Sequence, residues 1–116
     1  MIRTLTLGAL TGLCIVANAA DGIAEERAVM MVRHQVADYP KWREVFDDQE
    51  AVRQSSGLDN VRVYQSADNP DEIVILLDAA DLEKARAFAG SEELKARMID
   101  AGVKGKPDIL FLTITK

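Results

Sequence analysis

Histidine, cysteine and aromatic residues are scarce in this chain. Its 116 residues include one His, one Cys and one Trp, and aromatic residues make up 5% of the total. A single imidazole and a single thiol cannot assemble the usual zinc or iron–sulfur ligand sets, so we expect no metal site of that kind. Seven glycines and three prolines are also too few for a collagen-like or low-complexity chain.

Basic residues are outnumbered by acidic ones. The chain has 14 Lys and Arg against 19 Asp and Glu, which gives a net charge of −5. Nucleic-acid binding depends on a basic surface that neutralises phosphates, so this balance argues against a nucleic-acid partner. A content of 48% hydrophobic and 28% charged residues is typical of a globular protein, and the length fits one domain.

The first 19 residues have the order of a secretory signal peptide. Arg3 supplies a positive charge, residues 4–16 are predominantly apolar, and Ala17-Asn18-Ala19 matches an A-x-A cleavage box. This apolar stretch is shorter than the roughly 20 residues that span a membrane. We therefore expect cleavage after Ala19 and a secreted or periplasmic protein with no membrane attachment.

Two further features belong to this N-terminal region. Cys14 raises the alternative of a lipid anchor, but Leu13 precedes it where a small residue is preferred. Residues 20–27 are polar and predict a flexible leader before a domain at 28–116. Cleavage would remove the cysteine, so the exported domain would hold no disulfide, and a small domain of this kind often gains stability by oligomerising.

Four strands and two helical regions are predicted in this domain. Runs of β-branched and long apolar residues place the strands at 28–36, 60–65, 72–78 and 108–115. The first helix is predicted over 40–56, where apolar positions repeat at helical spacing. The second helix begins after Asp81, is interrupted at Gly90 and ends at Gly102, and residues 104–107 are expected to form a turn.

The order β-α-β-β-α-β predicts an α+β, ferredoxin-like fold: a four-stranded antiparallel sheet with two helices on one face. The first and third strands are then central. The third strand is apolar on both sides, with Ile73, Ile75 and Leu77 on one and Val74 and Leu76 on the other. Because the helices cover a single face of the sheet, we expect a homodimer with its sheets stacked, a dimeric α+β barrel.

Several segments support this fold through a family resemblance. They are Val32–Arg43, Ile73–Leu77, Asp81–Arg86, and Gly102-Val103 before Pro107-Asp108-Ile109. Together they resemble small bacterial proteins of the dimeric α+β barrel superfamily, which are similar to antibiotic biosynthesis monooxygenase-like domains and are often labelled cyclases. The resemblance implies the fold and the dimer. It carries no catalytic residue set, because the superfamily spans cofactor-independent oxygenases, polyketide cyclases, haem-degrading enzymes and members without known activity.

Two functions are consistent with these observations. The first is an exported small-molecule-binding domain of unproven activity. The alternative is a cofactor-independent monooxygenase, isomerase or cyclase that acts on an apolar or aromatic small molecule. The sequence contains no glycine-rich phosphate loop, and we expect no cofactor.

His34 and Trp42 are the main candidates for ligand contacts. His34 lies late in a central strand, where it is either a buried histidine satisfied by a neighbouring group or a ligand-contacting residue and general base. Trp42 lies on the inner stripe of the first helix, as core or as a flat wall for a ligand. If His34 faces the helices, both residues border one cleft; if it faces the barrel, it lines that cavity with the fourth strand.

Three further candidates lie on the strands. Arg33 is on the opposite face of its strand from His34, where it would bind an anionic ligand or pair with a carboxylate across the dimer. Tyr64 and Phe111 are aromatic residues of the second and fourth strands. Strand parity alone leaves open whether these two residues share a face with Arg33.

Overall fold

The computed structural model describes residues 28–115. The predicted signal peptide at 1–19, with Cys14, and the predicted leader at 20–27 lie outside the described residues. Among residues 28–115, no helix combines the length and the apolar character needed to cross a membrane.

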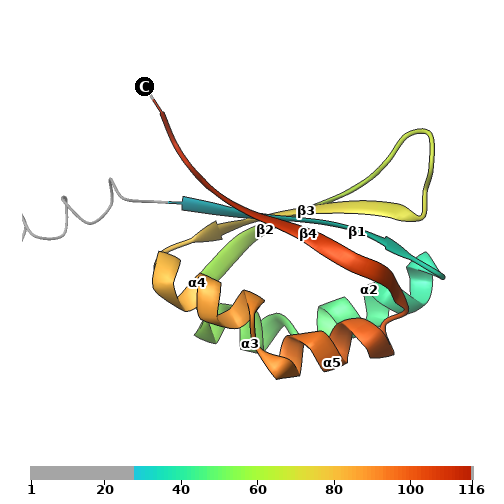
Figure 1. Cartoon of the computed structure of the whole chain (residues 1–116), viewed down its shortest axis with the longest axis horizontal. Helices are drawn as coiled ribbons and strands as arrows, with labels where there is room; N and C mark the ends of the chain where they lie inside the picture. The colour runs from blue at the N-terminus through green and yellow to red at the C-terminus, as the bar shows by residue number, and fades with distance from the viewer. Residues whose placement is uncertain (1–27, 116) are drawn as a thin grey trace, which may run out of the picture.

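Four strands and four helices make up this part of the chain (Figure 1). In chain order they are β1 (Ala28–Val36), α2 (Tyr39–Asp48), α3 (Glu50–Ser55), β2 (Leu58–Gln65), β3 (Glu72–Ala79), α4 (Leu82–Ala89), α5 (Glu92–Asp100) and β4 (Val103–Thr113). All neighbouring strands are antiparallel, in the order β2-β3-β1-β4. The ferredoxin-like fold is therefore confirmed, with β1 and β3 in the centre and the helices on one face of the sheet.

Each predicted helical region consists of two helices. The interruption at Gly90 is confirmed, and Ser91 Oγ accepts a hydrogen bond from the Leu94 N–H at 3.1 Å to begin α5. The single helix predicted over 40–56 is instead broken at Gln49. There the Phe46 carbonyl accepts from the Gln49 N–H at 3.1 Å and from Arg53 Nη1 at 2.6 Å. The arginine thus caps the last turn of α2, as cationic side chains at helix C-termini do.

The fourth strand differs from the prediction. It begins at Val103, so residues 104–107, expected as a turn, belong to the strand. Its pairing with β1 shifts register between Arg33 and Gln35, and Gly105 adopts a positive φ of 71°. A bulge of this kind places additional residues in a strand without ending it, and a glycine with positive φ is typical of it. Glycine and proline in this segment therefore mark a bulge.

The core lies between the sheet and the helices. Alternate residues of β1 and β3 point to the helices and are buried: Ala28, Met30, Val32, His34 and Val36 on β1, and Ile73, Ile75, Leu77 and Ala79 on β3. Trp42 from α2 and Ala85 from α4 close over them. This alternation follows from the period-two geometry of a strand with one helix-covered face.

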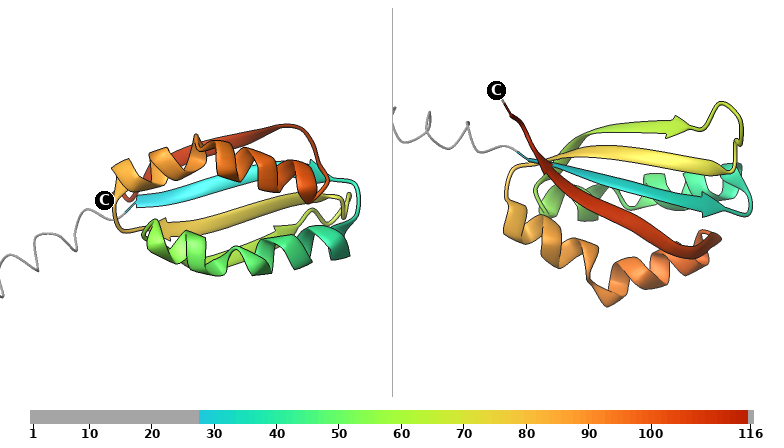
Figure 2. Two further views of the ribbon diagram at one scale, coloured as in Figure 1. Left: turned by 90° about the horizontal axis from the view of Figure 1, so that it is seen from below. Right: turned by 45° about the horizontal axis from the view of Figure 1, so that its top comes forward.

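No helix of the described chain covers the other face of the sheet (Figure 2, right). We call this surface the open face. Its centre is apolar, because Met31 pairs with Leu76 on β3 and with Leu110 on β4. Arg33 binds Glu72 at 2.9 Å on this same face.

Candidate ligand-binding site

A small apolar cavity lies on the helix side of the two central strands. On the helix-covered face, α2 and α3 run along one edge of the sheet and α4 and α5 along the other, with β1 and β3 between them (Figure 2, left). The cavity has a volume of about 60 Å³. Its apolar lining comes from β1, β3, α2, α4 and the α5 region: Met30, Val32, Trp42, Val45, Phe46, Ile75, Leu77, Phe88, Leu94, Met98 and Ala101. Four polar side chains join them: His34, Gln49, Arg53 and Arg97.

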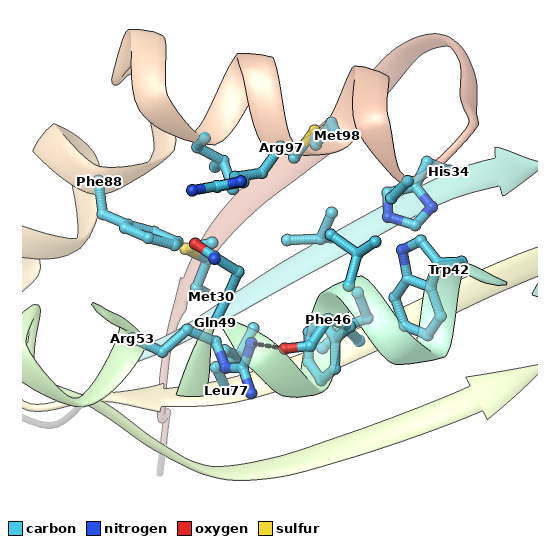
Figure 3. Close-up of a pocket in the computed structure, with 15 residues that line it drawn as sticks. Met30, His34, Trp42, Phe46, Gln49, Arg53, Leu77, Phe88, Arg97 and Met98 are labelled. Atoms are coloured by element: carbon cyan, nitrogen blue, oxygen red, sulfur yellow. Dashed lines mark hydrogen bonds between the residues drawn. The ribbon is translucent and has the colours of Figure 1, made fainter. Parts of the chain in front are cut away.

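His34 and Trp42 form one end of this cavity (Figure 3). Their ring centroids are 5.7 Å apart, and the rings meet edge to face at 70°. Trp42 in turn stacks on Phe46, with centroids 4.8 Å apart and an interplanar angle of 20°. Of the two orientations considered for His34, the structure has the one that faces the helices. The imidazole and the indole therefore border one apolar cleft.

The His34 side chain is buried and incompletely hydrogen-bonded. The residue is 6% exposed, and its Nδ1 atom has no hydrogen-bond partner among the described residues. Burial disfavours the imidazolium and lowers the pKa of His34 below its ordinary value of 6.5. The side chain is therefore a neutral imidazole at neutral pH. It can accept a proton or hydrogen bond on one nitrogen and donate a hydrogen bond from the other.

Arg53 is a second buried polar residue on the cavity wall. It is also 6% exposed, and its guanidinium carbon lies 3.8 Å from the centroid of the Phe46 ring. Its Nη1 atom donates to the Phe46 carbonyl, whereas its Nε atom is buried without a partner in residues 28–115 (Figure 3). Burial lowers the pKa of Arg53, but a guanidinium remains charged at neutral pH.

Sequence reasoning did not identify Arg53, Gln49 or Arg97 as site residues. The signal for the first two was the spacing of the inner stripe itself, since positions 42, 46, 49 and 53 recur at helical intervals. A cationic residue at a position that continues an apolar helical stripe is expected to lie on the side of the helix that faces the core. Arg97 follows Leu94 by three residues on α5 and reaches the cavity from the opposite wall.

The remaining predicted residues lie outside the cavity. Arg33 and Tyr64 are on the open face, and Arg33 pairs with Glu72 of its own chain. Phe111 is on the helix side of β4, so it does not share a face with Arg33. The Arg86 guanidinium carbon lies 4.7 Å from the centroid of the Phe111 ring. The structure thus brings together His34 and Trp42 alone among the five predicted residues.

The described residues contain no group of three or more His, Cys, Asp and Glu side chains placed to hold a metal ion. The chemistry available at the cavity is that of an apolar surface with a neutral imidazole, a primary amide and guanidinium groups. Such a surface can orient a small molecule by a few polar contacts while its apolar lining provides most of the contact area.

The fold is that of the antibiotic biosynthesis monooxygenase-like proteins, as the sequence resemblance implied. A Bordetella bronchiseptica protein provisionally assigned as an antibiotic biosynthesis monooxygenase has a TM-score of 0.65 and 9% identity, covering 78% of this chain and 99% of that chain. A Caulobacter crescentus protein with the same provisional assignment has a TM-score of 0.62 and 16% identity, covering 85% of this chain and 99% of that one.

A third structure is SnoaB, a cofactor-independent oxygenase from Streptomyces nogalater. It has a TM-score of 0.64 and 13% identity, covering 78% of this chain and 95% of that chain. No family model matches the sequence, and no curated protein matches it. At these identities the likeness establishes the fold.

Proposed function

We propose that this chain is an exported small-molecule-binding domain that holds an apolar or aromatic compound in the cavity beneath its helices. The observation that carries the proposal is the pair of buried nitrogen atoms on an apolar cavity wall, His34 Nδ1 and Arg53 Nε, neither with a protein partner in residues 28–115. Buried polar atoms in folded proteins are nearly always hydrogen-bonded. Unpaired donors or acceptors that converge on an apolar cavity are typical of ligand sites.

The size of the cavity limits the ligand. Its volume of about 60 Å³ is well below the roughly 300 Å³ of the smallest drug-sized sites. It is also below the roughly 150 Å³ of an engineered cavity that binds benzene. Gln49, Arg97 and Met98 are long, flexible and incompletely buried lining residues, so their rearrangement can enlarge the cavity. We therefore propose a ligand with a single ring or an equivalent aliphatic group.

A cofactor-independent oxygenase, isomerase or cyclase is the second candidate. The neutral imidazole of His34 favours it, because a general base must be unprotonated at working pH and within reach of the ligand. Such a base would take a proton from an acidic C–H or O–H group of the ligand. Oxygenation would additionally require molecular oxygen as the oxidant. SnoaB, a cofactor-independent oxygenase, has this fold.

A homodimer through the open face is part of the proposal. Leu110 and Leu112 are 51% and 42% exposed there, and Met31 and Leu76 lie in the same row as Leu110 through strand pairing. A contiguous apolar patch of this kind is unusual on a monomer, and a second copy stacked on it would remove it from water.

Export is proposed from the order of charge, apolar stretch and A-x-A box in residues 1–19. The expected mature N-terminus is Ala20. Intact-mass spectrometry of protein recovered from the periplasm measures it directly. A full-length mass, or a mass that includes lipid on Cys14, would contradict the proposal.

The ligand site is tested by paired unfolding and binding measurements. We expect small single-ring aromatic compounds to raise the thermal unfolding temperature of the wild type. His34→Ala and Trp42→Ala should lower the affinity for these compounds more than they lower stability. Tyr64→Ala is the matched control, because Tyr64 is an aromatic residue of the open face and does not line the cavity. If no compound binds, or if both cavity variants bind as the wild type does, the site is wrong.

A further inference from the structure

We propose that the cavity selects a ligand with a carboxylate group, and that Arg53 supplies the counter-charge. This inference rests on the proposed ligand site and specifies the class of molecule that it takes. Arg53 is a cation that is 6% exposed on an apolar wall, and it takes part in none of the ion pairs found in residues 28–115. Charged side chains are rarely buried to this extent without a partner of opposite charge.

The groups that contact the Arg53 guanidinium carry no net charge. One is the Phe46 carbonyl, which accepts from Nη1 at 2.6 Å, and the other is the Phe46 ring. A carbonyl dipole and an aromatic quadrupole compensate a cation partly. The buried Nε–H has no acceptor in the described chain. A carboxylate oxygen is a strong acceptor for that N–H, because charge-assisted hydrogen bonds exceed neutral ones in strength.

The nearest carboxylates of the chain have other partners. Asp47 and Glu50 favour the charged form of Arg53 through space. However, Asp47 pairs with Arg43 at 3.1 Å, and Glu50 accepts from the Gln54 side chain at 3.4 Å. Both acids are exposed and line a polar groove beside the cavity together with Phe46 and Arg53, but neither acid lines the cavity itself. Neither provides the missing contact at Nε.

A second arginine lines the cavity from the facing helix. Arg97 extends from α5, while Arg53 and Gln49 extend from the side of α2 and α3 (Figure 3). The Arg97 side chain is 47% exposed, and its contact with Asp100 is long, at 3.9 Å. Arg97 is therefore free to turn toward an anion. These donors lie near Met30 and Phe88, and His34 and Trp42 lie at the far end (Figure 3).

This arrangement predicts the orientation of the ligand in the cavity. Met30 and His34 are four residues apart on β1, which corresponds to about 13 Å along the strand. A carboxylate held by Arg53 would place an attached ring on the apolar middle of the cavity, beside the edge of Phe46, because Arg53 and Trp42 lie against the Phe46 ring itself. The inferred ligand class is thus the small aromatic carboxylic acids, bound as anions.

Benzoate and benzamide test the inference, because they share a ring and a planar head group and differ in charge. Trp42 is the sole tryptophan of the chain, so its fluorescence reports on the cavity, and calorimetry provides an independent affinity. At neutral pH we expect the wild type to prefer benzoate by about 10- to 100-fold. Arg53→Gln should lower the benzoate affinity to that of benzamide and leave the benzamide affinity unchanged, whereas Arg53→Lys should retain part of the preference.

Arg43→Gln is the matched control. Arg43 also lies over the Phe46 ring, at 5.7 Å from its centroid, but it is outside the cavity, so its loss should leave the preference intact. If Arg53→Gln does not fold, Arg97→Gln tests the carboxylate preference of the cavity through its second arginine, because Arg97 is exposed and its loss should reduce the preference at least about threefold.

Each outcome has a distinct meaning. Equal affinity of the wild type for the two probes would overturn the inference and leave the proposed ligand site standing. An undiminished preference in a folded Arg53→Gln, or in Arg97→Gln where that variant replaces it, would do the same. If neither probe binds the wild type, the inference and the proposed function both fail.

Discussion

The arginines on the open face of the sheet and the buried arginine beneath the helices have different partners. On the open face, Arg33 pairs with Glu72 at 2.9 Å and Arg62 pairs with Asp78 at 2.8 Å. On the helix face, the buried Arg53 has no carboxylate partner within residues 28–115.

The apolar residues of the two faces also differ in how deeply they are buried. Met30 and Val32 are buried beneath the helices, whereas Met31 between them is half-buried on the open face. The open face thus has paired charges around an uncovered apolar centre, which suits contact with another protein surface. The helix face has a covered apolar centre with an unpaired charge, which suits a small anion. The two sides of the sheet therefore differ in the covering of their apolar residues and in the pairing of their least exposed arginine.

Adjacent residues of β3 allow the strongest test of this comparison. Ile75 is 3% exposed on the helix face and Leu76 is half-buried on the open face. Ile75→Asp places a carboxylate in the core, and we expect it to cost more than about 4 kcal/mol and to unfold the domain. Leu76→Asp should instead preserve the far-ultraviolet circular dichroism of the wild type and abolish the proposed dimer.

Sedimentation at micromolar concentration provides the second readout for this pair. The wild type should sediment with about twice the monomer mass and folded Leu76→Asp with the monomer mass. A monomeric wild type would refute the dimer, and an unfolded Leu76→Asp would show that the two faces do not differ in the way described.

The architecture was predictable because local signals agree with it. The continuous apolar run Ile73–Leu77 and capping by Asp81 and Ser91 indicated the correct element order and the central position of β1 and β3. The break at Gln49 was not predictable in this way. The structure has a contact there between the Arg53 guanidinium and the Phe46 carbonyl, seven residues apart, and no glycine or proline marks the break.

The site was less predictable than the fold. Strand parity places His34 opposite Arg33 but does not say which of the two faces the helices. Phe111 shows the same limit, because its face depends on the register of β4 with β1, which the bulge near Gly105 shifts. The cavity also requires residues from separate helices, Arg53 and Arg97, and their approach follows from packing rather than from either segment alone.

A smaller effect is expected from the titration of His34, which is buried on the helix face and should make the stability of the domain depend on pH. The imidazole is buried on the helix face, and its pKa in the folded protein is lowered because burial penalises the charged form. In the unfolded chain the same group titrates near 6.5. Below that pH the unfolded state therefore binds more protons than the folded state. The linkage relation then requires the free energy of unfolding to fall as pH decreases and to level off above about 6.5.

Chemical denaturation between pH 5.5 and pH 8 measures this dependence, in a window above the range where ordinary carboxylates titrate. The wild type should lose stability toward pH 5.5, with a slope of at most about 1.4 kcal/mol per pH unit for one proton. His34→Gln keeps a polar side chain of similar reach but removes the titration, so its stability should vary less across the same window. A carboxylate held by Arg53 should leave this difference in place, since the arginine and the imidazole lie at opposite ends of the cavity (Figure 3). If the two proteins show the same pH dependence, His34 is not a buried neutral imidazole, and the interpretation of it as a base at the end of an apolar cavity fails with it.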